Sequence, residues 1–139
     1  MMSYRNHAEV EPHEWPWRHF LPVEMADRTT GELVVAQDFM DWLEAIRLAY
    51  GKPIVLNSGY RTPLHQWELT GRYTGAHVDG MAGDVRVWGE DAHMLLRVAY
   101  GHGVLGVGVS QIGPVEKRYV HLDRWTKAPE GLRPRLWNY

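Results

Sequence analysis

The segment from Thr74 to Asp84 reads T-G-A-H-V-D-G-M-A-G-D, and a second histidine, His121, follows downstream in the run Y-V-H-L-D. Zinc in proteins takes imidazole nitrogen and carboxylate oxygen, and a catalytic zinc keeps three protein ligands with the fourth position open to water. His77, Asp84 and His121 supply such a set. The sequence therefore predicts that these three residues converge on one metal ion.

Small residues separate the first two predicted ligands. His77 lies in a glycine-flanked loop and Asp84 opens a predicted strand, so Gly80 and Gly83 let the intervening turn bring both side chains to one point. A lone histidine is more often a hydrogen-bonded structural residue than a metal ligand. Three such positions within one pattern favour the ligand interpretation.

Two helices are predicted from the apolar pattern. From Gln37 to Tyr50 the apolar residues recur at helical spacing, and Gly51 stands where a left-handed C-terminal cap is expected. This spacing gives the first helix one buried face. The second helix is expected over Glu90–Tyr100, with glycines directly after it to end it.

The strands are expected at residues 53–57, 84–88, 106–110 and 118–123. In the last of them Tyr119, His121 and Asp123 share one face, because side chains alternate along a strand, and the apolar residues between them share the other. Residues 64–75 show no period and are predicted to form a loop with a partial helical turn.

Residues 1–36 are expected to form an irregular N-terminal arm that packs on the body, since prolines interrupt an aromatic-rich stretch. One short helix is predicted near Pro22–Met25. The C-terminal tail ends in Trp137 and Tyr139, which are expected to dock on the body. The prediction is one domain over residues 1–139, an α+β fold with a small, mainly antiparallel sheet and helices packed on one side.

Composition excludes several classes of protein. A net charge of -2 gives no attraction for phosphates, so no nucleic-acid partner is expected. The chain has no cysteine, so any metal site uses nitrogen and oxygen ligands. No apolar run is long enough to cross a bilayer, and the N-terminus lacks the apolar core of a signal peptide, so neither membrane insertion nor export by a signal of its own is expected.

The motif H-x-x-G-x-A-x-D at residues 77–84, with S-G-Y-R at 58–61 and H-L-D at 121–123, resembles the zinc D-alanyl-D-alanine carboxypeptidase family. This family groups with lysostaphin-type and hedgehog-type domains. The likeness runs from Phe20 to Tyr139 and is closest to the short cell-wall peptidases of phages and prophages.

The resemblance implies a zinc-dependent peptidase that hydrolyses amide bonds in peptidoglycan stem peptides, as a D-Ala-D-Ala carboxypeptidase or an endopeptidase. It implies that His77, Asp84 and His121 hold Zn2+, and that Arg61 contacts the substrate and polarises the scissile carbonyl or its oxyanion. A fixed guanidinium suits that task. The residues expected to bind the substrate are Ser58, Tyr60, Arg61 and Trp125.

Two departures from the family pattern leave the general base open. Members with an E-x-x-H motif have glutamate where this chain has Arg118, and many members have serine where it has Gly75. Asp123 is one candidate base, because it shares a strand face with His121, and it is equally suited to orient that histidine by a hydrogen bond. Glu116 is the other candidate, with a solvated loop charge as its alternative role.

Two other hypotheses compete with the peptidase. The missing glutamate motivates a non-catalytic zinc-binding module with a structural or cell-wall-binding role. A metal-free structural virion protein would require that the three predicted ligands not converge. For the peptidase, the missing signal predicts synthesis in the host cytoplasm, followed by release through a holin-like pore or carriage in a phage particle among other virion proteins. A phage lysin or virion-associated cell-wall hydrolase is therefore expected.

Overall fold

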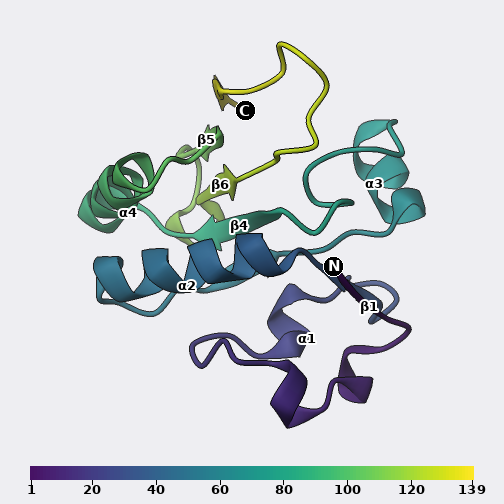
Figure 1. The fold of residues 1–139 in the computed structure, drawn as a ribbon. Helices are drawn as coiled ribbons and strands as arrows, with labels where there is room; N and C mark the ends of the chain where they lie inside the picture. Colours follow the sequence, from purple (N-terminus) through teal and green to yellow (C-terminus); the bar gives the residue numbers. More distant parts are fainter.

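The computed structural model describes residues 1–139 and has four α-helices and two sheets (Figure 1). The α-helices are α1 (Pro22–Met25), α2 (Gln37–Tyr50), α3 (Pro63–Thr70) and α4 (Gly89–Gly101). The strands are β1 (Met2–Tyr4), β2 (Leu33–Val35), β3 (Leu56–Ser58), β4 (Ala82–Arg86), β5 (Gly106–Ser110), β6 (Tyr119–Asp123) and β7 (Arg135–Asn138). Three short 3-10 helices are η1 (His7–Glu9), η2 (Pro12–Glu14) and η3 (Val115–Lys117). These elements confirm the predicted α+β class.

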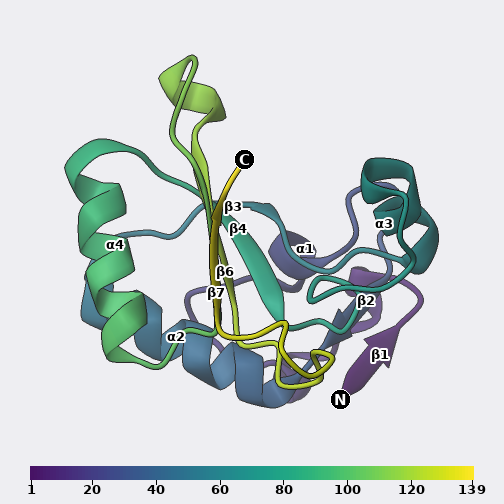
Figure 2. The same ribbon diagram turned by 90° about the horizontal axis from the view of Figure 1, so that it is seen from above.

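The larger sheet has the strand order β3-β4-β6-β5-β7. Its first four strands are antiparallel to their neighbours, and β7 joins the edge parallel to β5. Helices α2 and α4 lie together on one side of this sheet, as predicted, whereas α3 lies on the other side of the strands (Figure 2). The side of the sheet away from α4 is therefore the one that faces α3.

The apolar core lies between the two long helices and the sheet. Leu43 of α2 and Leu95 of α4 are fully buried, and they belong to one apolar cluster with Val85 and Val120, which pair directly across β4 and β6. Burial of such side chains contributes about 25 cal/mol per Å² of apolar surface removed from water. Because side chains alternate along these strands, the polar residues next to each valine in sequence face away from this core.

All three predicted helices are confirmed, including the short helix α1 at Pro22–Met25. α2 has the predicted bounds and ends at Gly51, whose φ of 76° is the left-handed conformation expected of a C-terminal cap. α4 extends the predicted range by one residue at each end. β5 has the predicted bounds, and β6 begins one residue later than predicted.

Residues 63–70 form a helix where the sequence analysis predicted a loop with a partial turn. The Thr62 side chain accepts a hydrogen bond from the His65 backbone at 3.2 Å, Pro63 occupies the first turn, and Gly71 ends the helix in the left-handed conformation. Its ends thus carry regular capping signals. The prediction of a loop was wrong over this part of the chain.

Two predicted strands are displaced and three strands were not predicted. β3 spans 56–58 rather than 53–57, and β4 spans 82–86 rather than 84–88. The tail docks as predicted, but it does so as β7. In the N-terminal arm, β1 and β2 pair with each other, so the arm is less irregular than predicted.

The N-terminal arm contributes side chains to the apolar core. Trp17, Phe20 and Met25 are buried in the same apolar cluster as the helices and the sheet. None of the helices has both the length and the apolar character that crossing a membrane requires.

Asp27 ties the arm to the start of α3. Its Oδ1 accepts hydrogen bonds from the Thr29 backbone and hydroxyl and from the Thr30 backbone, at 2.6–3.0 Å. Its Oδ2 accepts from the Thr62 backbone at 2.7 Å and from Nδ1 of His65 at 2.9 Å. Burial acts to raise the pKa of Asp27, but these hydrogen bonds outweigh it and hold the pKa well below its ordinary value.

We expect Asp27→Ala to lower the free energy of unfolding by about 3 kcal/mol, because it leaves one buried donor and several partly buried donors without a partner. A depressed carboxyl pKa contributes stability above the unfolded value of about 4, and this contribution is lost as pH falls toward the folded pKa. The native protein should therefore lose more stability below about pH 4 than the variant does. Urea unfolding at several pH values measures both effects, with the exposed Glu130→Ala as the control.

Candidate metal centre

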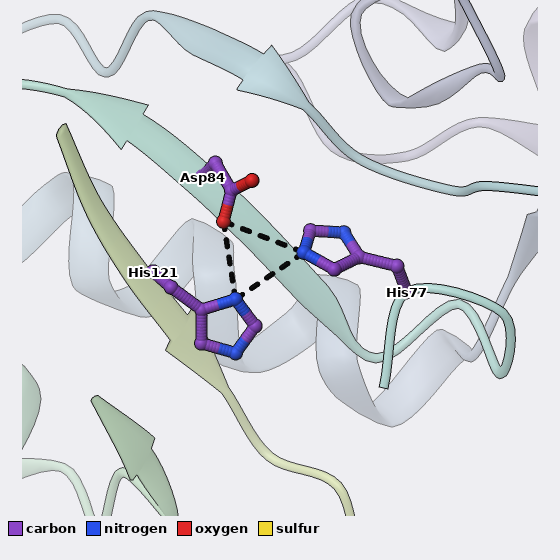
Figure 3. Close-up of side chains that lie close together, drawn as sticks. All are labelled: His77, Asp84 and His121. Carbon is purple, nitrogen blue, oxygen red and sulfur yellow. Dashed lines mark hydrogen bonds and ion pairs between the residues drawn. The ribbon is translucent and has the colours of Figure 1, made fainter. Parts of the chain in front are cut away.

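Three residues from different parts of the chain meet on the sheet face that looks away from the core. Asp84 lies in the middle of β4 and His121 in the middle of β6, and the two are direct cross-strand partners. His77 reaches the same point from the turn that precedes β4 (Figure 3). All three side chains are buried, and the structure thus brings together the set that the sequence predicted.

The turn between His77 and Asp84 requires glycine at position 80 but not at position 83. Gly80 has a φ of 67°, and a Cβ there would lie 2.5 Å from the carbonyl oxygen of Val34. Only glycine satisfies both conditions without strain. Gly83 has no positive φ and lies in β4, so the predicted role in the turn belongs to Gly80 alone.

Each histidine has one ring nitrogen fixed by the protein and one aimed at the common point. Nδ1 of His77 lies 2.6 Å from the carbonyl oxygen of Gly59, which only accepts, so Nδ1 carries the proton and Nε2 presents its lone pair. Nε2 of His121 lies 2.7 Å from Oδ2 of Asp123, so its Nδ1 is the free atom. Metal-binding histidines show this pattern of one outer hydrogen bond that fixes the tautomer.

The three free atoms form a triangle of the size that zinc requires. Nε2 of His77 lies 3.2 Å from Nδ1 of His121, and Oδ1 of Asp84 lies 3.3 Å and 3.1 Å from those two atoms (Figure 3). Tetrahedral ligands about 2.0–2.1 Å from zinc are separated by about 3.3–3.4 Å. The residues present therefore fit a zinc ion with three protein ligands.

The electrostatics favour the ligating protonation states of His77 and Asp84, whereas His121 holds a proton that a metal would have to displace. Burial lowers the pKa of His77, which favours the neutral, ligating imidazole. Burial acts to raise the pKa of Asp84, but its interactions with His77 and His121 lower it well below the ordinary range. Burial acts to lower the pKa of His121, and its hydrogen bonds to Asp123 and Asp84 raise it, which makes the ring a more basic ligand.

Asp123 lies behind His121 rather than beside the metal position. Its side chain is fully buried, and its Oδ2 contacts the nitrogen of His121 that points away from the other two ligand atoms. The hydrogen bonds of Trp125 and Arg133 occupy the same carboxylate. This geometry favours the orienting role for Asp123 over the role of general base.

A pocket of about 320 Å³ opens beside Asp84. It is lined by Arg28, Asn57, Ser58, Arg61, His65, Leu69, Asp84 and Tyr119. The Arg61 guanidinium is fixed in it, since it donates to the Ser58 hydroxyl at 3.0 Å, to Gln66 at 3.1 Å and to Oδ2 of Asp84 at 2.8 Å. A guanidinium has five N–H donors, so two remain for another partner.

The structure brings only some of the other predicted site residues to the pocket. Ser58 and Arg61 line the pocket, but Tyr60 and Trp125 are buried and do not. The indole of Trp125 donates to Asp79 at 2.7 Å, which holds it inside the protein. Glu116 is an exposed residue of η3 in the projecting β5–β6 connection and lies outside the pocket lining (Figure 2), so its role as a base stays a prediction.

Five pocket residues were not assigned to the site from the sequence: Arg28, Asn57, His65, Leu69 and Tyr119. Tyr119 has the strand alternation that places it on the face of His121, which was the available signal. Burial raises its pKa, so its hydroxyl remains a donor. His65 was expected to brace its loop, and it does contact Asp27, but α3 also turns it toward the pocket. No motif in the sequence signals that second role.

Comparison with known proteins agrees with the geometry. The family model described as Peptidase M15 matches residues 18–123, a span that contains all three candidate ligands and Arg61. No curated protein matched the chain, and no solved structure did either. This family is zinc D-Ala-D-Ala carboxypeptidase-like, as the motifs predicted. The chain belongs to the peptidase M15 family.

Proposed function

We propose that this protein is a zinc-dependent peptidase that hydrolyses amide bonds in peptidoglycan stem peptides, as a D-Ala-D-Ala carboxypeptidase or an endopeptidase. The observation that carries the proposal is the convergence of His77, Asp84 and His121 beside a pocket that also holds Arg61. Membership of the peptidase M15 family supports the reaction class. A role as a phage lysin or virion-associated hydrolase is proposed from the motif resemblance described above.

His77, Asp84 and His121 would hold the zinc. When bound, zinc lowers the pKa of a coordinated water to about 7 and polarises a carbonyl group. Arg61 directs positive charge at the oxygen on which negative charge develops, and its three contacts within the protein hold it in place before substrate arrives. Tyr119 lines the same pocket, and its raised pKa keeps its hydroxyl protonated.

His65 is the pocket residue best suited to move a proton. Apart from the ligand Asp84, no carboxylate lines the pocket, and the family's usual glutamate is replaced by Arg118. Histidine is the commonest general acid–base residue. The buried Asp27 fixes Nδ1 of His65 at 2.9 Å, which leaves Nε2 for proton exchange in the pocket. We therefore assign proton transfer to His65.

We expect His65→Gln to lower kcat by about 10²-fold or more while one zinc per chain is retained, since general acid–base catalysis contributes about 10²–10⁴-fold. Steady-state kinetics on purified stem peptide and zinc analysis of the same sample measure the two effects. The exposed histidine of α4 provides the control, and His93→Gln should change neither quantity. Unchanged kcat in His65→Gln would remove His65 from the mechanism.

A non-catalytic zinc-binding module is the second candidate function. It is favoured by the same absence of a second carboxylate from the pocket lining. Such a module would bind zinc and cell-wall fragments but would not cleave the fragments, so their masses would stay unchanged.

Digestion of purified peptidoglycan, followed by mass analysis of the released fragments, separates the two functions. The peptidase should release fragments whose masses identify the cleaved bond, and a chelator should stop the release. Added zinc should restore it. A zinc-loaded protein that binds peptidoglycan and releases nothing would favour the non-catalytic module.

A further inference from the structure

Asp123 is the outer partner of a candidate metal ligand, and it is a buried charge. Its side chain is 0% exposed, with Oδ2 at 2.7 Å from Nε2 of His121. A buried carboxylate requires hydrogen bonds and an opposite charge. The Trp125 backbone donates to Oδ1 at 3.1 Å, which is a neutral contact. The opposite charge has to come from elsewhere.

Arg133 supplies that charge and contacts both carboxylate oxygens. Its Nε lies 3.1 Å from Oδ1 and 3.2 Å from Oδ2 of Asp123, and its Nη2 lies 2.8 Å from Oδ2. A planar guanidinium that contacts both oxygens fixes the plane of the carboxylate as well as its position. The orientation of Oδ2 toward His121 is thereby fixed.

Aromatic residues near the C-terminus hold Arg133 in turn. The guanidinium carbon lies 5.1 Å from the ring centre of Trp125 and 5.2 Å from that of Trp137, distances typical of cation–π contacts. Trp137 also packs against the ring of His121, with 5.0 Å between ring centres. Trp137 of β7 and Arg133, two residues before that strand, thus lie behind the same ligand.

The neighbouring strand β5 leaves room for the ion pair between Asp123 and Arg133. Gly106 of β5 is the direct partner of Asp123 in β6. A Cβ at Gly106 would overlap the Asp123 carboxylate and lie 2.7 Å from Nε of Arg133. Any side chain at this position would displace the ion pair.

We propose that Arg133 is a positioning residue for the metal centre: it fixes Asp123, and Asp123 fixes His121 with Nδ1 directed at the metal. The proposal rests on the proposed function only in requiring that the centre bind zinc. Arg133 lies beyond residues 18–123, the span matched by the family model. The C-terminal segment therefore adds a part of the metal centre that the matched span does not contain.

Zinc affinity tests the proposal without reference to activity. We expect the zinc Kd of Arg133→Gln, measured by competition with a chromophoric chelator, to rise about 10- to 100-fold, as for the loss of other outer partners of metal ligands. Arg133→Lys keeps the charge but loses the contact with both carboxylate oxygens, so its zinc Kd should lie between those of the native protein and Arg133→Gln. The visible spectrum of the Co2+-loaded protein should change in both variants. The control Arg97→Gln removes an exposed arginine of α4 and should bind zinc as the native protein does.

A double variant tests whether Arg133 acts through Asp123. If it does, Arg133→Gln combined with Asp123→Asn should weaken zinc binding no more than Asp123→Asn alone. A native Kd in both Arg133→Gln and Arg133→Lys would overturn the proposal, and so would fully multiplicative losses in the double variant. If the native protein takes up no zinc, the proposed function fails together with this inference.

Discussion

Replacing His77 with alanine is expected to abolish zinc binding and peptidase activity together. The substitution removes one of three ligand atoms and leaves only Asp84 and His121 around the metal position. Metal-ion catalysis contributes several kcal/mol to transition-state stabilisation, and each 1.4 kcal/mol corresponds to a factor of ten in rate. Activity should therefore fall by about 10³-fold or more.

Thermal unfolding provides a second measurement for the same variant. A metal that binds only the folded state raises the melting temperature, so added zinc should stabilise the native protein and a chelator should reverse the effect. The melting temperature of His77→Ala should respond to neither. His93→Ala, at an exposed position of α4, should behave as the native protein does. Stoichiometric zinc in His77→Ala would exclude the proposed ligand set.

Arg61→Met is expected to separate catalysis from metal binding. Methionine keeps much of the apolar stem but removes the guanidinium that donates to Ser58, Gln66 and Asp84. Loss of one donor to a developing oxyanion costs about 10²–10³-fold in rate. We expect a loss of that size in kcat/KM, with one zinc per chain retained.

The non-catalytic module predicts a different result for Arg61→Met. A module that binds zinc for structural reasons has no reaction to lose, and Arg61→Met would then change only stability or cell-wall binding. Arg97→Met, at an exposed position of α4, controls for the general effect of removing an arginine. Full kcat/KM in a zinc-loaded Arg61→Met would show that Arg61 has no part in catalysis.

The convergence of His77, Asp84 and His121 could be predicted from the sequence because its parts are local or periodic. The first two candidate ligands are only seven residues apart, and the third lies on a strand with regular alternation. Helix α2 was equally predictable, since most of its large apolar residues recur at helical spacing on one buried face and Gly51 ends it. Each of these features is fixed by interactions among residues close in sequence or on one face of an element.

The helix α3 shows where periodicity fails. Gln66 is its one buried residue, and Leu64, Trp67 and Leu69 are exposed, so no apolar stripe marks it. The helix is specified instead by its caps and by Asp27, which binds its first turn from a distant part of the chain. The T-P start and the glycine at the end are the signals in the sequence that indicate this helix.

Strand β7 could not be predicted from the sequence, for a different reason. Three of its residues are exposed and only Trp137 is half-buried, so it has no alternating pattern. Its position depends on parallel pairing with β5 and on contacts of Trp137 with His121 and Arg133. The orienting role of Asp123 was one of two alternatives left open by the sequence, but the contact of Arg133 with Asp123 could not be predicted from the motifs.

The zinc content of the purified protein, determined by mass spectrometry of the metal after dialysis against metal-free buffer, tests the central claim most directly. The arrangement of His77, Asp84 and His121 predicts about one zinc per chain in the native protein and none in His77→Ala. A native protein that retains no zinc, and gains none when zinc is added back, would contradict the metal centre and the peptidase built on it.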